Sequence, residues 1–145
     1  MSLQINYKNG YLKNKTDNLV IFVDESFNTL HLKKHLLSKE YAFINDLLKV
    51  SDKKSKIISY DISSKKKVIL VSINKNFKNS DFESLGAKFY DLIKVMKQNN
   101  FIIDTGTIKN TAKNFIGYFL HGIKLKSYNF EKYKSKKNKK KILIT

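Results

Sequence analysis

Apolar residues alternate with polar ones at the start of the chain and then form a continuous run. Leu3, Ile5 and Tyr7 follow a two-residue period, which is typical of a half-buried strand near the edge of a sheet. The run NLVIFV at 18–23 is rich in β-branched residues and predicts a central strand covered on both faces, with Asp24 at its end. This part of the chain is therefore expected to supply an edge strand and a central strand.

The spacing changes to three and four residues between Thr29 and Val50. This spacing predicts two short helices, with Ser38 as the N-cap of the second. A β-hairpin is expected next, because the apolar segments KIISYDI (56–62) and KKVILVSI (66–73) are joined by the short polar link SSK.

The most distinct helix is predicted to begin at Ser80, where Ser80 and Glu83 have the spacing of a capping box. Apolar residues then recur every three or four positions, and Gly86 lies on the same stripe. A glycine there would let the helix approach a sheet closely, despite a propensity cost of about 1 kcal/mol. A short strand at 101–103 follows, with a turn at 105–106.

A final helix is expected at 111–126, and a closing strand at 142–144. The lysine-rich segment SKKNKKK at 135–141 is predicted to be a solvated loop between them. Strands and helices alternate in the second half while a hairpin interrupts their order, which predicts an α/β fold with a mixed sheet and helices on both faces. A chain of 145 residues suffices for one domain, so residues 1–145 are taken as a single domain.

Charge and composition narrow the function classes. The formal net charge of +17 is typical of proteins that bind nucleic acids. However, the chain contains lysine but no arginine, and arginine is the usual residue for bidentate phosphate and guanine contacts. The absence of arginine therefore argues against a protein that binds DNA with sequence specificity. The absence of cysteine excludes disulfides and thiolate metal sites. No apolar run approaches the roughly 20 residues of a membrane span, and no signal peptide is recognised, so a cytoplasmic protein is expected.

Few residues are candidates for chemistry. Asp24 and Glu25 end a buried strand, where open α/β sheets often place ligand-binding groups, but a strand end facing water is the favoured interpretation. His31 and His35 have the spacing of a zinc-protease helix, yet Leu32 replaces the glutamate that this chemistry needs, so solvated histidines are favoured over a metal site. No nucleophile lies beside a recognisable base, and the chain alone is not expected to be an enzyme.

The segment HGIKLKSYNFEKYKSKK combines a glycine-containing helix with spaced aromatic residues. Its six pattern positions are Gly122, Leu125, Tyr128, Phe130, Tyr133 and Lys134. This pattern resembles the end of the N-terminal domain in the leucyl (cytosol) aminopeptidase family. Tyr128 and Phe130 alternate just after the predicted helix end, so both are expected on one side of the departing chain. The order of elements is also similar to that domain, including the helix with Leu85–Gly86, whereas the turn at 72–75 lacks the family's usual glycine.

The resemblance implies a macro-domain-like three-layer sandwich that precedes a separate catalytic domain. In the family that second domain holds two divalent metal ions with their carboxylate and lysine ligands, and none of those motifs maps onto this chain. No catalytic, cofactor-binding or metal residue is therefore carried over. The resemblance further implies a role in homo-oligomer assembly and in limiting access to the active site, with the catalytic domain of the parent enzyme as partner.

Two alternatives stay open beside this leading hypothesis. One is a nucleic-acid-binding module, since some bacterial members of the family bind DNA, and lysines interleaved with Tyr133 could hold single strands. Its candidate contacts are Lys132, Lys136, Lys137, Lys139, Lys140 and Lys141. The other is a macro-like domain that binds a nucleotide ligand such as ADP-ribose, although the chain has no glycine-rich phosphate loop.

Overall fold

The computed structural model describes residues 3–7, 18–29, 36–50, 55–62, 66–74, 76–96, 100–107, 115–133 and 140–144. The strands within these ranges are β1 (Leu3–Tyr7), β2 (Asn18–Asp24), β3 (Ile57–Asp61), β4 (Lys67–Ile73), β5 (Asn100–Ile103) and β6 (Lys140–Ile144). The helices are α1 (Ser38–Val50), α2 (Asn79–Lys94) and α3 (Phe115–Tyr133), with a 3-10 turn, η2 (Thr105–Thr107).

The six strands form one mixed sheet in the order β1-β6-β5-β2-β4-β3. Neighbouring strands are parallel except β3 and β4, which form the predicted antiparallel hairpin. β1 is an edge strand, and β2 lies between β4 and β5, as their hydrophobic patterns predicted. In the register, Val20 of β2 lies opposite Ile69 on one side and Ile103 on the other.

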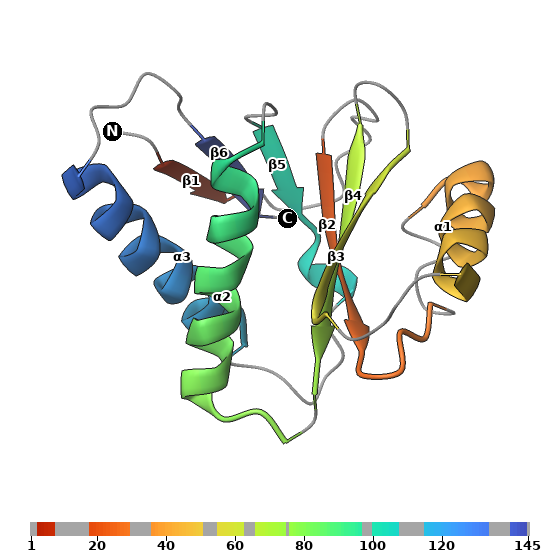
Figure 1. Ribbon diagram of the computed structural model, residues 1–145, viewed down its shortest axis with the longest axis horizontal. Helices are drawn as coiled ribbons and strands as arrows, with labels where there is room; N and C mark the ends of the chain where they lie inside the picture. The colour runs from red at the N-terminus through yellow and green to blue at the C-terminus, as the bar shows by residue number, and fades with distance from the viewer. Residues whose placement is uncertain are drawn as a thin grey trace.

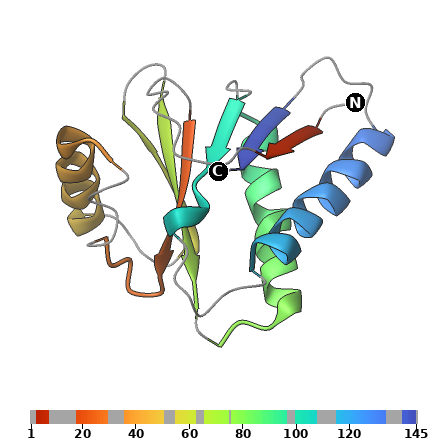
Figure 2. The same cartoon turned by 180° about the vertical axis from the view of Figure 1, so that it is seen from behind.

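Helices cover both faces of the sheet (Figure 1). α1 lies on one face, and α2 and α3 lie together on the other, an arrangement that is also clear from behind (Figure 2). The predicted fold class, an α/β three-layer sandwich with a mixed sheet, is therefore confirmed.

Two hydrophobic cores result from these layers. On the α2–α3 side, β2 contributes Val20 and Phe22, and the Phe22 ring meets Phe115 and Phe119 edge-on at centroid distances of 5.0 and 5.7 Å. On the α1 side, the alternate residues Ile21 and Val23 pack in the second core. The continuous apolar run of β2 thus arises because successive side chains point to opposite faces and both faces are covered.

The helix starts differ from those predicted. α1 begins at Ser38, but its cap is Leu37, whose C=O accepts the first helical bond from Tyr41 (2.9 Å) and whose N–H donates to Glu40 Oε1 (3.4 Å). Ser38 is therefore not the N-cap. Most of the predicted preceding helix lies outside the described residues, and Thr29 is not helical.

At α2 the predicted Ser80–Glu83 capping box is wrong. The helix begins at Asn79, and the Lys78 N–H donates to Asp81 Oδ2 (2.7 Å). In both helices a carboxylate in the first turn reaches back to the cap N–H, which is the half of a capping box that needs no serine or threonine at the cap.

Candidate functional site

The α2–α3 crossing brings the two helix backbones into direct contact at Gly86 and Gly122. A Cβ on Gly122 would lie 2.0 Å from the carbonyl oxygen of Glu83, and one on Gly86 would lie 2.0 Å from that of Phe119. Each helix therefore approaches the other at a residue without a side chain. Gly86 was expected to permit close approach to the sheet, and this expectation is wrong, since α3 is what it meets.

Polar contacts join the two helices around this crossing. Glu83 Oε1 of α2 lies 2.9 Å from His121 Nδ1 of α3, and Asp91 Oδ2 of α2 lies 3.6 Å from Lys126 Nζ of α3. These side chains are partly exposed, and ion pairs that are open to solvent contribute little stability. The two helices are therefore held together mainly by the close packing at the glycines and by the buried aromatic contacts Phe82–Phe115 and Phe89–Phe119 beside it.

The family-pattern residues fall into separate environments on α3. Gly122 is buried at the crossing, whereas Leu125 and Tyr128 are 50% and 67% exposed. Phe130 and Tyr133 also belong to α3, because the helix ends at Tyr133 rather than at the predicted Lys126. Residues two apart in a helix are separated by about 200° around its axis. The expectation that Tyr128 and Phe130 lie on one side of an extended chain is therefore wrong.

Of the six candidate nucleic-acid lysines, three lie on elements that the structure describes. Lys132 lies in α3, and Lys140 and Lys141 lie in strand β6 rather than in the loop predicted for 135–141. Three further candidates, and the last residue of the family pattern, lie outside the described residues: Lys136, Lys137, Lys139 and Lys134.

A second candidate region is the carboxyl edge of the sheet. β2 and β5 are parallel neighbours, yet the chain continues from β2 to α1 on one face and from β5 to α3 on the other (Figure 1). Such a switch point is where open α/β sheets most often bind ligands.

At this edge Asp24 is used to build a turn. Its Oδ1 accepts the N–H groups of Ser26 and Asn28, both at 3.0 Å, and its carbonyl oxygen accepts from Phe27 N–H at 3.0 Å. Phe27 has a φ of 56°, a left-handed conformation, while its side chain is buried in the α1-side core. Glu25 is exposed. The geometry agrees with the interpretation of Asp24 as a strand terminator.

Thr107 completes the edge where β5 no longer pairs with β2. The Phe22 N–H donates to Thr107 Oγ1 (3.0 Å), and that hydroxyl donates to the Asp104 carbonyl (2.7 Å). Asp104 N–H in turn donates to the carbonyl of Val20 (3.0 Å). The sequence indicated a turn at 105–106, but nothing in it pointed to Thr107 as a partner for a strand 85 residues away.

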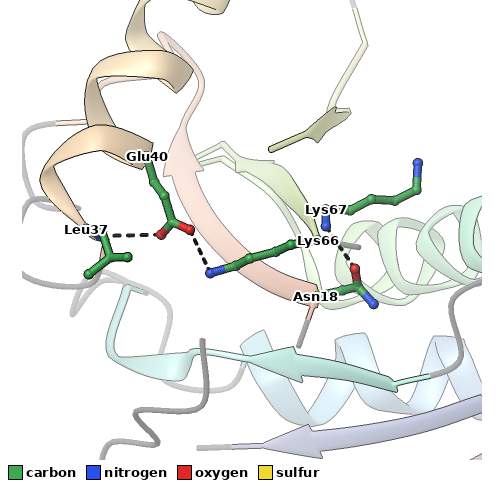
Figure 3. Close-up of polar contacts among 5 residues, drawn as sticks. All are labelled: Asn18, Leu37, Glu40, Lys66 and Lys67. Atoms are coloured by element: carbon green, nitrogen blue, oxygen red, sulfur yellow. Dashed lines mark hydrogen bonds and ion pairs between the residues drawn. The ribbon is translucent and has the colours of Figure 1, made fainter. Parts of the chain in front are cut away.

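The opposite, amino edge of the sheet carries a polar network that the sequence did not indicate (Figure 3). Asn18 donates through Nδ2 to the Asn100 carbonyl (2.9 Å) and accepts the Lys67 N–H at Oδ1 (2.8 Å), which joins the starts of three strands. Nearby, Lys66 Nζ lies 2.9 Å from Glu40 Oε2, and both side chains are largely buried. The pair of Glu40 and Lys66 thus links α1 to the β3–β4 hairpin of the sheet.

Neither edge forms a metal centre in the part of the chain that the structure describes, where no group of three or more His, Asp or Glu side chains converges. His31 and His35 lie outside that part. Of the helices described, none is both long and apolar enough to cross a bilayer.

No protein-family model matches the chain, and no curated protein matches its sequence. Among solved structures, a leucine aminopeptidase variant from tomato matches 99% of this chain with a TM-score of 0.66 and 17% sequence identity. This chain spans only 32% of that tomato chain.

Macrodomains match at similar quality. The macrodomain of Thermus aquaticus DarG matches 99% of this chain and 98% of its own, with a TM-score of 0.62 and 11% identity. That of Mycobacterium tuberculosis DarG matches 97% of both chains, with a TM-score of 0.66 and 12% identity. At such identities the likeness establishes the fold, which is macrodomain-like.

Proposed function

We propose that the chain is the non-catalytic N-terminal domain of a leucyl-aminopeptidase-like enzyme. In the parent enzyme it serves assembly and restricts access to the active site, while a separate domain with two divalent metal ions removes N-terminal amino acids from peptides. The tomato aminopeptidase, of which this chain spans about a third, supports the proposal at the level of the fold.

The observation that carries the proposal is the α2–α3 crossing, where Gly86 and Gly122 each meet the backbone of the other helix. Gly122 begins the family pattern, and Gly86 lies in the helix at 80–96, which the resemblance also includes. In the structure each meets the backbone of the other's helix at a distance that excludes any side chain. Two segments that resemble the aminopeptidase domain are thus coupled, because the crossing of their helices requires a glycine in each. This coupling argues against the alternative that the pattern at 122–134 is a chance run of aromatic residues.

The non-catalytic part of the proposal is tested with the purified chain. Leucine p-nitroanilide is incubated with the chain and Mn²⁺ or Zn²⁺, and release of p-nitroaniline is followed against a metal-only control. We expect no release above that control. Release that needs the chain and is abolished by a chelator would overturn this part.

The parentage is tested by sequencing the gene downstream of Thr145. We expect the reading frame to continue into a region with the metal-binding motifs of an aminopeptidase. A stop codon, or an unrelated domain, contradicts a role as part of such an enzyme.

A macro-like domain that binds a nucleotide is the second candidate. It is supported by the nearly complete coverage of both DarG macrodomains and by the switch point between β2 and β5. The backbone donors described at this edge oppose it, because those of Ser26 and Asn28 are bonded to Asp24 and that of Phe22 to Thr107. A phosphate would have to displace these internal acceptors.

ADP-ribose distinguishes the two candidates. A ligand at 100 times its Kd stabilises a protein by about 2.7 kcal/mol, which a thermal unfolding scan detects readily. We expect no saturable shift of the unfolding midpoint. A saturable shift would favour the nucleotide-binding candidate.

A further inference from the structure

The outer side of β3 carries the peptide groups to which a further strand would bond. β3 lies at one end of the sheet, and none of the described strands pairs with its outer side. In an antiparallel pair, only alternate residues exchange backbone hydrogen bonds with the neighbouring strand. The Ser72 N–H donates to the Lys56 carbonyl (2.8 Å), so the even-numbered residues of this segment bond to β4. The N–H and C=O groups that point outward are therefore those of Ile57, Ser59 and Asp61.

The contacts of Lys67 confirm this assignment. Lys67 lies opposite Asp61 in the register, but its N–H donates to Asn18 Oδ1 (2.8 Å), on the other side of β4. Opposite residues that exchange no backbone hydrogen bonds have closer side chains. Lys67 Nζ accordingly lies 2.7 Å from Asp61 Oδ1. The peptide groups of Asp61 thus face away from β4.

At Ile57 the side chain of Ser55 occupies the place of a neighbouring strand. Ser55 Oγ donates to the Ile57 carbonyl (2.9 Å), and the Ile57 N–H donates to Ser55 Oγ (3.4 Å). One hydroxyl therefore bonds to both peptide groups that an added strand would need at this residue. Ser55 is exposed, so water would satisfy these groups equally well if the hydroxyl were absent. The contact is not required to avoid a buried unpaired group, and its effect is to occupy the edge.

The other outward-facing residues offer little to a further strand while Ser55 is in place. The Asp61 side chain is 69% exposed, and charged side chains on an edge strand discourage pairing with another chain. Ser59 lies between the occupied residue and the charged one. A single residue pair is too short to hold an added strand.

We propose that Ser55 is an edge stop, a side chain that prevents a second copy of the chain from extending the sheet at β3. Two copies of β3 match in register when they run antiparallel about Ser59, because Ile57 of each copy then lies opposite Asp61 of the other and all these peptide groups face the partner. Each such pair exchanges two backbone hydrogen bonds. The Ser55 hydroxyl blocks both outer pairs and leaves only the central one, which must also overcome the repulsion between two chains of net charge +17. The inference does not depend on the aminopeptidase parentage.

The test compares variants that keep or lose the hydroxyl. S55T keeps it, S55V has nearly the same shape without it, and S55A removes it with the smallest change. Association is measured by sedimentation over a range of protein concentrations in 0.15 M NaCl, where the Debye length is about 8 Å. Amide hydrogen exchange at low and high protein concentration locates the contact. S55A/S59P removes an outward N–H that does not bond to β4, and proline is tolerated in an edge strand at such a position.

We expect S55A and S55V to associate at least about tenfold more tightly than the wild type and S55T, because the outer residue pairs become available for backbone hydrogen bonds. The amides of Ile57, Ser59 and Asp61 should gain protection as S55A associates, and S55A/S59P should associate no more than the wild type. Association of S55A and S55V no tighter than that of the wild type would overturn the proposal. Equal association of S55T and S55V, or protection that appears away from β3, would overturn it as well.

Discussion

Single side chains determine how strand β2 ends. The carboxylate of Asp24 accepts two backbone N–H groups and so stabilises the turn in which Phe27 adopts a positive φ. D24A removes the acceptor of both hydrogen bonds, and we expect it to lower the free energy of unfolding by about 1–2 kcal/mol, measured by urea denaturation. D24N retains an oxygen at the same place and should cost less than half as much.

The neighbouring carboxylate provides the control for this prediction. Glu25 is exposed, so E25A should change stability by less than about 0.5 kcal/mol. If D24A and E25A have equal effects, the turn does not depend on the Asp24 carboxylate.

A second prediction concerns the hydroxyl group of Thr107. Its hydroxyl is the acceptor for the Phe22 N–H, and its side chain is 2% exposed. T107V keeps the shape but leaves that N–H buried without this acceptor, which we expect to cost about 1–3 kcal/mol. T107S keeps the hydroxyl and should be clearly more stable than T107V. Amide exchange at Phe22 should accelerate in T107V, and unchanged exchange there would contradict the assigned bond.

The helices depend on a steric condition at their crossing. G122A and G86A each place a Cβ at 2.0 Å from a backbone oxygen of the other helix, which no rotamer change can relieve. We expect each to destabilise the fold by about 3 kcal/mol or more, at the upper end of overpacking effects. Urea denaturation monitored by circular dichroism measures the loss.

Gly117 is the matched control for the two crossing glycines. It lies in the same helix α3, is exposed, and has nothing within 4 Å of the position that a Cβ would take. G117A should therefore stabilise the protein by up to about 1 kcal/mol, because alanine has the higher helix propensity. Equal destabilisation by G117A and G122A would show that glycine is not required for the crossing.

Element types were predictable from the sequence, whereas some boundaries were not. The run at 18–23 is continuously apolar, and the two hairpin segments are apolar stretches joined by a short polar link. These patterns predicted strands, and the strands are confirmed. The end of α3 was placed too early because Tyr128 and Phe130 mimic the alternation of an extended segment. Residues 127–132 contain no glycine or proline, so the sequence has no helix-breaking residue that would end α3 at Lys126.

Across the whole molecule, the contacts that sequence reasoning missed join residues far apart in the chain. Gly86 and Gly122 stand out in the sequence, but only the three-dimensional arrangement shows that each lies against the backbone of the other's helix. The pair of Glu40 and Lys66 connects α1 to the hairpin across 26 residues of sequence. Local periodicity carries no information on such partners, which is why the layers could be predicted and the crossing could not.

The net charge of +17 should make the stability of the whole fold depend on ionic strength. With 29 basic and 12 acidic residues, repulsion between lysines outweighs attraction in the compact state, and unfolding relieves it by separating the charges. Screening shortens the Debye length from about 30 Å at 0.01 M salt to about 8 Å at 0.15 M. We therefore expect NaCl over this range to stabilise the protein, by about 1 kcal/mol or a midpoint rise of roughly 4 °C.

Lysines on the exposed surface allow a control for this salt effect. K39Q/K49Q/K88Q replaces three exposed lysines and lowers the net charge by three, while glutamine and lysine have similar helix propensities. The triple variant should unfold at a higher temperature than the wild type in low salt and should gain less from added NaCl. Salt also weakens attractive ion pairs, which would lower stability. The ion pair of Glu40 and Lys66 is largely buried and is screened less, so it should offset the stabilisation by salt only weakly. A midpoint that falls with salt, or an equal gain in the triple variant, would mean that local ion pairs rather than overall repulsion control the stability.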